Sequence, residues 1–177
     1  KLEMADIDLV ELVQQTNGEF EERFDLRHLK IISDFPDGMI IIRADGRRLW
    51  RVLENLYTNA VKYAMEHSRV YADVVEQDGK AIFIIKNVSE NPLNISPDEI
   101  TERFVRGDVS RTTEGSGLGL SIARSYARLM GGDIVVASEE GKGTTFTADM
   151  QLDLAQEDTS KGKESVPQKE VNFAGKR

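Results

Sequence analysis

The sequence predicts an α+β fold, a two-layer α/β sandwich in which helices pack on one face of a mixed, mostly antiparallel sheet. Two observations predict it. Helical segments and β-hairpins follow one another in runs, without the regular strand–helix–strand alternation that builds a parallel sheet. Of the 177 residues, 40% are hydrophobic and 31% are charged, a balance typical of globular domains. We expect one folded domain over residues 1–153 and a flexible tail or vector remnant over residues 154–177, which are rich in Lys, Glu, Ser and Gln.

The first third of the chain combines helices with short strands. Asp8 is suited to cap a helix, because its carboxylate accepts hydrogen bonds from backbone N–H groups of the first turn. Pro36-Asp37-Gly38 is typical of a turn between two extended segments. The expected elements are a helix from Asp8 to about Arg23, short strands over residues 29–35 and 39–42, and a long helix over residues 45–66.

Two hairpins and further helices follow. Apolar, β-branched segments flank the turns Gln77-Asp78-Gly79-Lys80 and Glu140-Gly141-Lys142-Gly143, which predicts two hairpins. Ser96-Pro97 is suited to begin a short helix, and Gly131-Gly132 to end one. The expected elements are strands over residues 70–75 and 81–88, a short helix from Ser96, a helix over residues 118–130, and strands over residues 134–138 and 144–150.

Composition excludes several classes of function. The net charge is -8, which argues against a nucleic-acid partner. The chain has no cysteine, so disulfides, thiolate nucleophiles and Cys-ligated zinc are excluded. It has two histidines, which argues against a metal site built from several histidines. No apolar run approaches the roughly 20 residues that a membrane span needs.

The helix expected over residues 45–66 has a polar stripe beside its hydrophobic face. At about 100° per residue, Asn55, Asn59 and Lys62 fall in one arc, and Tyr63 lies between that arc and the hydrophobic one. Asn is unfavourable inside a helix by roughly 0.5 kcal/mol relative to Ala, so two of them one turn apart need compensation. The stripe is either a solvated face or the lining of a groove, where amide oxygens suit Mg²⁺ and a lysine suits phosphate. The hydrophobic arc holds Leu49, Val52, Leu53, Leu56, Ala60 and Ala64.

A loop rich in Gly, Ser and Thr leads into the helix expected over residues 118–130. Gly115, Gly117 and Gly119 stand at alternate positions, where the lack of a Cβ lets the backbone approach a bulky anion. The N-terminus of the following helix adds a partial positive charge. A phosphate cradle and a flexible linker are both compatible with this loop. It lacks the Gly-Lys-Ser/Thr of a P-loop, and its glycine spacing differs from the dinucleotide fingerprint.

In their order and spacing, several motifs together resemble those of bacterial sensor histidine kinases. The resemblance covers about residues 6–152 and implies membership of the GHKL superfamily, whose ATP site lies between one sheet face and the helices. The matching segments are residues 51–64 for the N box, residues 102–108 with Ser110-Arg111 for the F box, residues 115–123 for the second glycine box, and residues 131–134 and 141–146 for the closing hairpin.

The resemblance implies that the site binds ATP and Mg²⁺. Asn59 would ligate the Mg²⁺ that bridges the ATP phosphates, and Asn55 would support that ion. Together with Lys62 and Arg106, these are the expected catalytic residues. The implied nucleotide contacts are Lys62 with phosphate, Tyr63 with the ribose and base, Arg106 and Arg111 with the γ-phosphate, and Gly115, Gly117, Leu118 and Gly119 with the polyphosphate.

One stretch departs from the family pattern. The first glycine box of the family usually reads Asp-x-Gly-x-Gly, and its Asp accepts a hydrogen bond from the adenine amino group. Here Asn87 stands in place of the Asp, and Ser89 and Asn91 replace the glycines. An amide oxygen can still accept from the amine, although it brings no charge. Asn87 is therefore expected to contact adenine, with an ordinary loop after a strand as the alternative.

The implied function is that of the ATP-binding catalytic domain of a sensor histidine kinase. It would transfer the γ-phosphoryl group to a histidine on a separate dimerisation domain, for relay to a response regulator. The expected partners are these phosphoacceptor helices, in a parent homodimer, and the regulator. The family places this domain in the cytoplasm, with the parent anchored in the cell membrane. Neither His28, before a strand, nor His67, after the long helix, has the sequence context of the phosphoacceptor.

Two alternatives belong to other functional classes. ATPases of the same superfamily hydrolyse ATP with a Glu one helical turn before the Mg²⁺-ligating Asn, a position that Asn55 holds here. Glu54 points about 100° away round the helix, and an amide cannot act as a general base, which disfavours hydrolysis. The altered first glycine box is compatible with a pseudokinase that signals by contact alone, although Asn59 and Lys62 argue against it.

Overall fold

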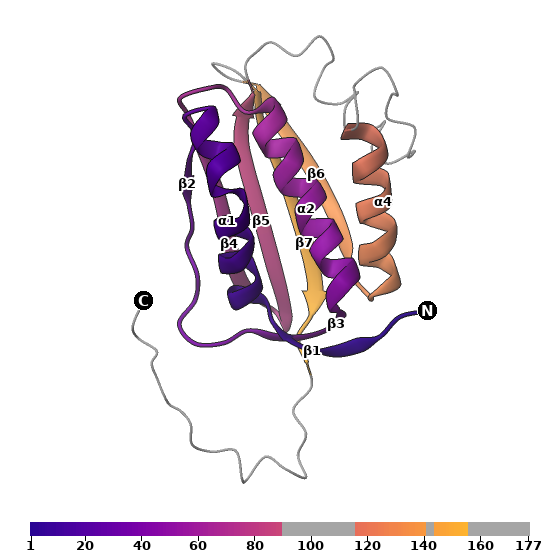
Figure 1. Ribbon diagram of the computed structural model, residues 1–177. Helices are drawn as coiled ribbons and strands as arrows, with labels where there is room; N and C mark the ends of the chain where they lie inside the picture. The colour runs from indigo at the N-terminus through magenta and orange to yellow at the C-terminus, as the bar shows by residue number, and fades with distance from the viewer. Residues whose placement is uncertain (90–115, 141–143, 156–177) are drawn as a thin grey trace, which may run out of the picture.

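The computed structural model describes residues 1–89, 116–140 and 144–155, and it has two layers (Figure 1). Helices α1 (Leu9–Leu26), α2 (Gly46–Tyr63) and α4 (Ser116–Leu129) cover one face of a five-stranded sheet. The strand order is β2-β4-β5-β7-β6, with β2 parallel to β4 and the other neighbours antiparallel. This confirms the predicted sandwich. The strands are β2 (Lys30–Ile32), β4 (Arg69–Gln77), β5 (Lys80–Ser89), β6 (Asp133–Glu140) and β7 (Thr144–Asp153).

A second sheet consists of β1 (Met4–Asp8) and β3 (Ile41–Asp45), which pair antiparallel. The sequence did not predict β1, because five residues with two acidic side chains show little strand periodicity. The bounds predicted for two strands, residues 29–35 and 39–42, were wrong. β2 and β3 flank the expected turn but belong to different sheets, so distant partners rather than the turn set their limits.

The long helix ends earlier than predicted. Residues 45–66 were expected to be helical, but Asp45 is the N-cap and α2 ends at Tyr63. Ala64 is extended, with ψ 146°, and forms an antiparallel bridge with Ser89 at the end of β5. The N–H of Met65 donates to the carbonyl of Val88 at 2.7 Å. Pairing with the sheet therefore stops the helix, a long-range cause that helical periodicity does not register.

Turn residues confirm the predicted hairpin between β4 and β5. Asp78 and Gly79 have φ angles of 52° and 78°. Positive φ at both central residues is typical of the type I′ turn, whose twist matches that of paired strands. Gly131, with φ 88°, follows the end of α4, as predicted. The short helix expected from Ser96 lies outside the described residues.

Aromatic side chains from both layers form the centre of the core. Phe20 of α1 and Phe83 of β5 lie 5.2 Å and 5.9 Å, between ring centroids, from Tyr57 of α2. Burial raises the pKa of the Tyr57 hydroxyl, which donates to Asn17 Oδ1 on α1. This contact satisfies the hydroxyl inside the core. The six residues of the predicted hydrophobic arc, Leu49, Val52, Leu53, Leu56, Ala60 and Ala64, are all buried.

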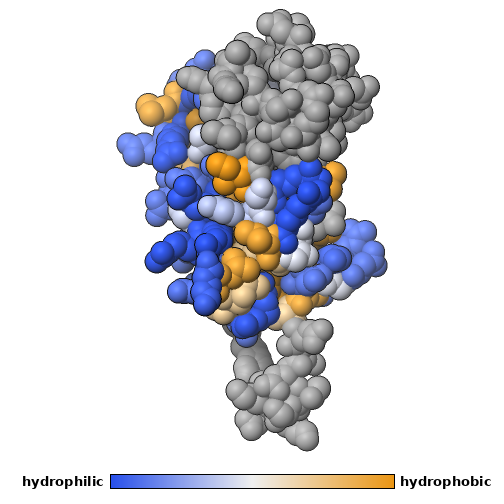
Figure 2. Space-filling view, turned by 90° about the vertical axis from the view of Figure 1, so that its right-hand side faces the viewer, coloured by the Kyte–Doolittle hydropathy of each residue, from blue (hydrophilic) through white to orange (hydrophobic). Residues whose placement is uncertain are grey.

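On the side of the molecule where α4 lies, hydrophobic residues stand among hydrophilic ones (Figure 2). Ile122 and Leu129 of α4 and Val135 of β6 are the exposed large hydrophobic residues of these two elements in the part described. None of the described helices is long and apolar enough to cross a membrane.

Candidate functional site

The two asparagines of the polar stripe on α2 are half-buried rather than solvated. Asn55 and Asn59 are both of intermediate exposure, whereas Thr58, between them in sequence, is exposed. A freely solvated stripe would leave both amides exposed, so their burial favours the groove interpretation. Lys62 is exposed, and its Nζ lies 5.9 Å from the ring centroid of Tyr63.

The stripe faces the neighbouring helix α4. Arg48 lies on the same side of α2 as the two asparagines, and its guanidinium lies 5.9 Å from the ring centroid of Tyr126 on α4. In Figure 1 the last turns of α2 and the first turn of α4 lie at the same end of the molecule. Gly117 and Gly119 belong to this first turn. The last turns of α2, with Asn59, and the first turn of α4 therefore lie at the same end of the helical layer.

The first turn of α4 supplies backbone N–H groups. Gly117, Leu118 and Gly119 lie within Ser116–Leu129, so the helix begins inside the predicted glycine loop. The first N–H groups of a helix have no partner within it, which makes them donors for an anion. Gly115, Arg106 and Arg111 lie outside the described residues.

Asn87 lies at the boundary between the sheet and the helices. It shares a face of β5 with Phe83 and Ser89, and Phe83 stacks against Tyr57 of α2, so this face is turned toward the helices. The Asn87 side chain is buried, with 5% of the residue exposed. Among the described residues its amide nitrogen, Nδ2, has no hydrogen-bond partner. Ser89 is also buried.

An unpartnered buried donor is costly, by about 1–3 kcal/mol, so a ligand acceptor at this point would recover free energy. The amide offers both a donor and an acceptor. Adenine presents a ring nitrogen that accepts and an amino group that donates, side by side. The chemistry of Asn87 therefore fits an adenine base.

Asp45 fixes the N-terminus of α2. Its carboxylate accepts from the N–H groups of Glu3, Arg47 and Arg48 at 2.8–3.1 Å and pairs with the Arg48 guanidinium at 2.8 Å. The N–H groups of Glu3 and then Arg48 are the main causes that lower its pKa to about 2. The helix expected over residues 45–66 included Asp45, so its role as the N-cap was not predicted, although an acidic residue before a helical segment is a known signal.

Arg27 fixes the other end of α2. It directly follows α1, and its Nη1 donates to the carbonyls of Val61 and Ala64 at 2.6 and 2.8 Å. A guanidinium here satisfies carbonyls that a helix end leaves unpaired and complements the negative end of the helix dipole. No local signal predicts this contact, because the partners are more than thirty residues away.

Ion pairs join α4 to β6. Asp133 Oδ1 accepts from Nε of Arg124 at 3.0 Å and from Nε of Arg128 at 3.2 Å. Partial burial of Asp133 opposes its ionisation, but hydrogen bonds from Arg124, the N–H of Ile134 and Arg128 outweigh it and lower its pKa. This pairing orients α4, and hence its first turn, relative to the sheet.

Comparison with known proteins relates this architecture to one family. Residues 44–155 match the family model described as histidine kinase-, DNA gyrase B-, and HSP90-like ATPase. The chain is 33% identical over 144 residues to the sensor histidine kinase WalK of Bacillus subtilis, a match covering 77% of this chain and 24% of that protein. It is 29% identical over 157 residues to the sensor histidine kinase ZraS of Escherichia coli, covering 89% of this chain and 33% of that protein. The chain thus spans about a quarter to a third of these relatives.

Solved structures show the same fold. The catalytic domain of the histidine kinase ThkA superposes with a TM-score of 0.71 at 25% identity, covering 84% of this chain and 95% of that chain. Full-length ShkA, solved in complex with AMPPNP, has a TM-score of 0.72 at 25% identity, covering 89% of this chain and 32% of that chain.

Proposed function

Because the chain belongs to the histidine kinase-, DNA gyrase B- and HSP90-like ATPase family, as an ATP-binding catalytic domain of the sensor histidine kinase type, we propose that it transfers the γ-phosphoryl group of ATP to a histidine on a separate helical dimerisation domain. The observation that carries the proposal is the placement of three features toward one end of the sandwich. Half-buried Asn59 lies in the last turns of α2, buried Asn87 lies near the end of β5, which bridges to Ala64 just after α2, and Gly117 and Gly119 lie in the first turn of α4.

Each side chain has a task that suits its chemistry. Asn59 offers an amide oxygen to Mg²⁺, and Asn55 lies one turn before it to support the same ion. When bound, Mg²⁺ would neutralise and orient the phosphate oxygens. Lys62 contributes a point charge to phosphate, and Asn87 holds the base. The main contribution of the protein is positioning, as is usual in phosphoryl transfer.

The same geometry favours transfer over hydrolysis. Asn55 cannot take a proton from water, and Glu54 is about 100° away from it round the helix. A water molecule near the γ-phosphate would therefore lack a general base on this stripe. We infer that the acceptor is protein-borne, on the dimerisation helices of a homodimeric, membrane-anchored parent, with a response regulator as the next acceptor in the cytoplasm.

Calorimetric titration with ATP, with Mg²⁺ and then with EDTA, tests the proposal. We expect binding in the micromolar-to-millimolar range that Mg²⁺ strengthens. Asn59→Ala should bind Mg–ATP at least about tenfold more weakly and lose the difference between Mg²⁺ and EDTA. Thr58→Ala, an exposed neighbour on α2, is the matched control and should behave like the unaltered protein.

Two results would contradict the proposal. Absence of ATP binding by folded protein would favour a pseudokinase. Unchanged Mg²⁺ dependence in Asn59→Ala would remove this residue as the metal ligand. Phosphorylation of added dimerisation helices from radiolabelled ATP then tests the transfer step directly.

A further inference from the structure

The two histidines of the chain, 39 residues apart in sequence, lie side by side. The imidazole rings of His28 and His67 are parallel to within 2°, with centroids 4.6 Å apart. Glu66 Oε2 lies 4.0 Å from Nε2 of each ring. One nitrogen from each ring and one carboxylate oxygen all lie within 4.8 Å of one another. We call these three residues the His–Glu–His cluster.

Both histidines occupy backbone conformations that usually belong to glycine. His28 has φ 56° and His67 has φ 67°. His28 ends α1: its N–H donates to Asp25 and the N–H of Leu29 donates to Phe24, a closure in which glycine is the usual residue. Placing a side chain with a Cβ at two such positions is unfavourable. Histidine tolerates positive φ better than most residues that carry a Cβ, so both turns can form while the two imidazoles project from them side by side.

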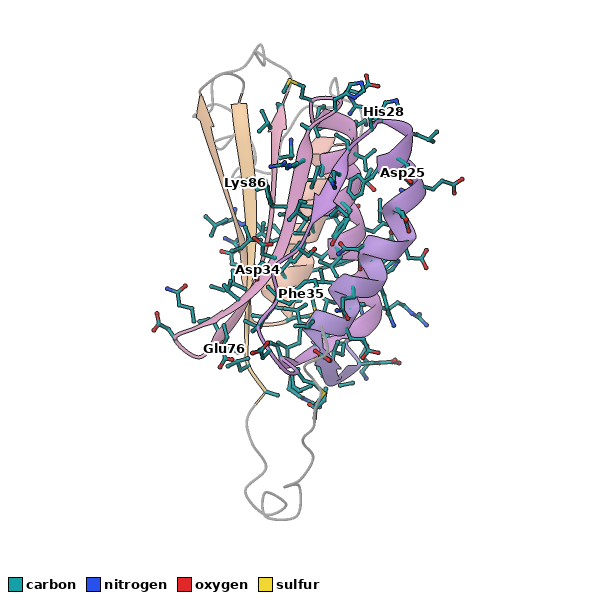
Figure 3. The ribbon with its side chains drawn as sticks, turned by 90° about the vertical axis from the view of Figure 1, so that its left-hand side faces the viewer. Asp25, His28, Asp34, Phe35, Glu76 and Lys86 are labelled. Atoms are coloured by element: carbon teal, nitrogen blue, oxygen red, sulfur yellow. The ribbon has the colours of Figure 1, made fainter. Side chains whose placement is uncertain are left out.

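Hydrogen bonds join the two segments beside the cluster. The N–H of His67 donates to the carbonyl of Arg27 at 3.4 Å, and the N–H of Lys30 donates to the carbonyl of Ser68 at 3.0 Å. The side chains have room to change rotamer, since those of His28, His67 and Glu66 are 59%, 70% and 50% exposed. Figure 3 shows His28 at one end of the molecule, just after α1. Fixed backbones with exposed, adjustable side chains suit a site that closes on a ligand.

We propose that the His–Glu–His cluster binds a divalent transition-metal cation, with Zn²⁺ as the best match. Two imidazole nitrogens and one carboxylate oxygen are typical zinc ligands, at about 2.0–2.2 Å from the metal. The fourth position would hold water. Ligand atoms now 4.0 Å apart would approach to about 3.3 Å in a tetrahedral site, and the rings would tilt out of their parallel stack. Rotation of exposed side chains provides both changes.

The donor set separates this site from the one proposed for Mg²⁺. Mg²⁺ prefers oxygen ligands in octahedral geometry, whereas imidazole favours zinc and its neighbours. The cluster lies where α1 meets β2 and where α2 connects to β4, outside the polar stripe of α2. The proposal therefore does not depend on the proposed kinase function. A bound cation would cross-link these two connections and stabilise the folded state.

Zinc titration of protein free of any histidine tag tests the proposal. The probe is Zn²⁺ in excess Mg²⁺, followed by calorimetry and thermal unfolding, and Co²⁺ gives a visible spectrum that reports its ligand geometry. We expect one zinc per chain and a melting temperature raised by about 5 °C at saturation. The imidazole proton signals of both histidines should shift together in NMR spectra.

Three variants and one control locate the cation. His28→Asn and His67→Asn keep side chains that tolerate positive φ, and each should weaken zinc binding at least about tenfold, as should Glu66→Gln. Asp78→Asn is the matched control, because Asp78 also has positive φ but lies in the β4–β5 turn. It should bind zinc like the unaltered protein.

The result that would overturn the proposal is zinc binding of equal strength in the unaltered protein and in both histidine variants, with folding verified by circular dichroism. Absence of zinc binding to the unaltered protein would overturn it equally. A zinc signal abolished by excess Mg²⁺ would place the cation on oxygen ligands instead and would also reject the site.

Discussion

Asp45 shows how one carboxylate can hold several backbone segments. It joins the chain near Glu3, the first turn of α2 and the Arg48 guanidinium, while its own N–H lies 3.4 Å from the sulfur of Met130 after α4. Its pKa is lowered from 3.8 to about 2 because these donors favour the ionised form, that of Glu3 most. Its contribution to stability is therefore complete above pH 3.8 and is lost as the pH falls through 2.

The first prediction follows from the lowered pKa of Asp45. Asp45→Asn should lower the free energy of unfolding at pH 7, and the difference from the unaltered protein should shrink between pH 4 and pH 2. Asparagine is itself a good N-cap, so the change isolates the contribution of charge. Urea unfolding at pH 7, pH 4 and pH 2 measures the free energy of unfolding of both proteins. Asp37→Asn, at an exposed position, is the control. A difference that stays constant with pH would contradict the role of ionisation.

Asn87 gives the second prediction at this scale. Asn87→Asp conserves volume but places a carboxylate where 5% of the residue is exposed. Burial disfavours the charged form, so the nucleotide-free variant should be less stable by about 1–3 kcal/mol at pH 8 and closer to the unaltered protein at pH 5. Chemical unfolding at the two pH values measures this. An equal loss of stability at pH 8 and pH 5 would mean that ionisation of the new carboxyl adds no cost and that the change of shape alone matters.

At the scale of elements, α2 is held at both ends by residues outside the helix. Asp45 caps its start, and Arg27, from the end of α1, binds the carbonyls of Val61 and Ala64 at its end. The proposed phosphate and metal residues lie in the last turns, next to the Arg27 contacts. A helix end that frays would carry Lys62 and Tyr63 with it, so this cap couples the order of α2 to the proposed site.

The third prediction concerns this cap. Arg27→Ala should destabilise the fold by about 1–3 kcal/mol and weaken ATP binding, since it frees two carbonyls at the end of α2. The stability and ATP affinity of Arg27→Lys should lie between those of the unaltered protein and Arg27→Ala, because one ammonium matches two carbonyls less well than a guanidinium. Exposed Arg51→Ala on the same helix is the control. Thermal unfolding measures the loss of stability, and ATP titration measures the loss of affinity. Normal ATP binding by a destabilised Arg27→Ala variant would contradict the proposed coupling between the end of α2 and the site.

Elements with strong local signals were predictable. The hydrophobic face of α2 and the turn at Asp78-Gly79 followed from side-chain periodicity and turn chemistry, and the structure confirms them. The bounds of β2 and β3 and the existence of β1 were not predictable, because their partners are distant along the chain. Local helical spacing indicated Asn55 and Asn59. The contacts of Arg27 and the meeting of His28 with His67 join residues that are distant along the chain, so no local pattern indicated them.

At the scale of the whole molecule, the described fold reaches to residue 155. Leu154 forms a bridge with Ile42, and the N–H of Ala155 donates to the carbonyl of Ile41 at 2.9 Å, so the end of β7 joins the small sheet to the large one. Leu152, two residues before this bridge, is buried. These contacts tie the last described residues to the β1–β3 sheet.

The fourth prediction is that a chain of residues 1–155 folds with a melting temperature within about 2 °C of the full chain. A chain of residues 1–151 should be less stable by about 2–3 kcal/mol or more, because it loses a buried leucine and both contacts with β3. Thermal unfolding followed by circular dichroism compares the three chains. A large loss in the 1–155 chain would show that residues 156–177 contribute to the fold.

The central position of β5 has a consequence for how the chain matures during synthesis. β5 pairs with β4 across a two-residue turn, which closes within microseconds, but its other edge pairs along its whole length with β7. A ribosome adds roughly 5–20 residues per second, so several seconds separate the emergence of β5 from that of β7. During that interval an apolar strand edge has no native neighbour. The nascent chain is then most exposed to aggregation and to chaperones, and slowed translation between the two strands should lower the soluble yield.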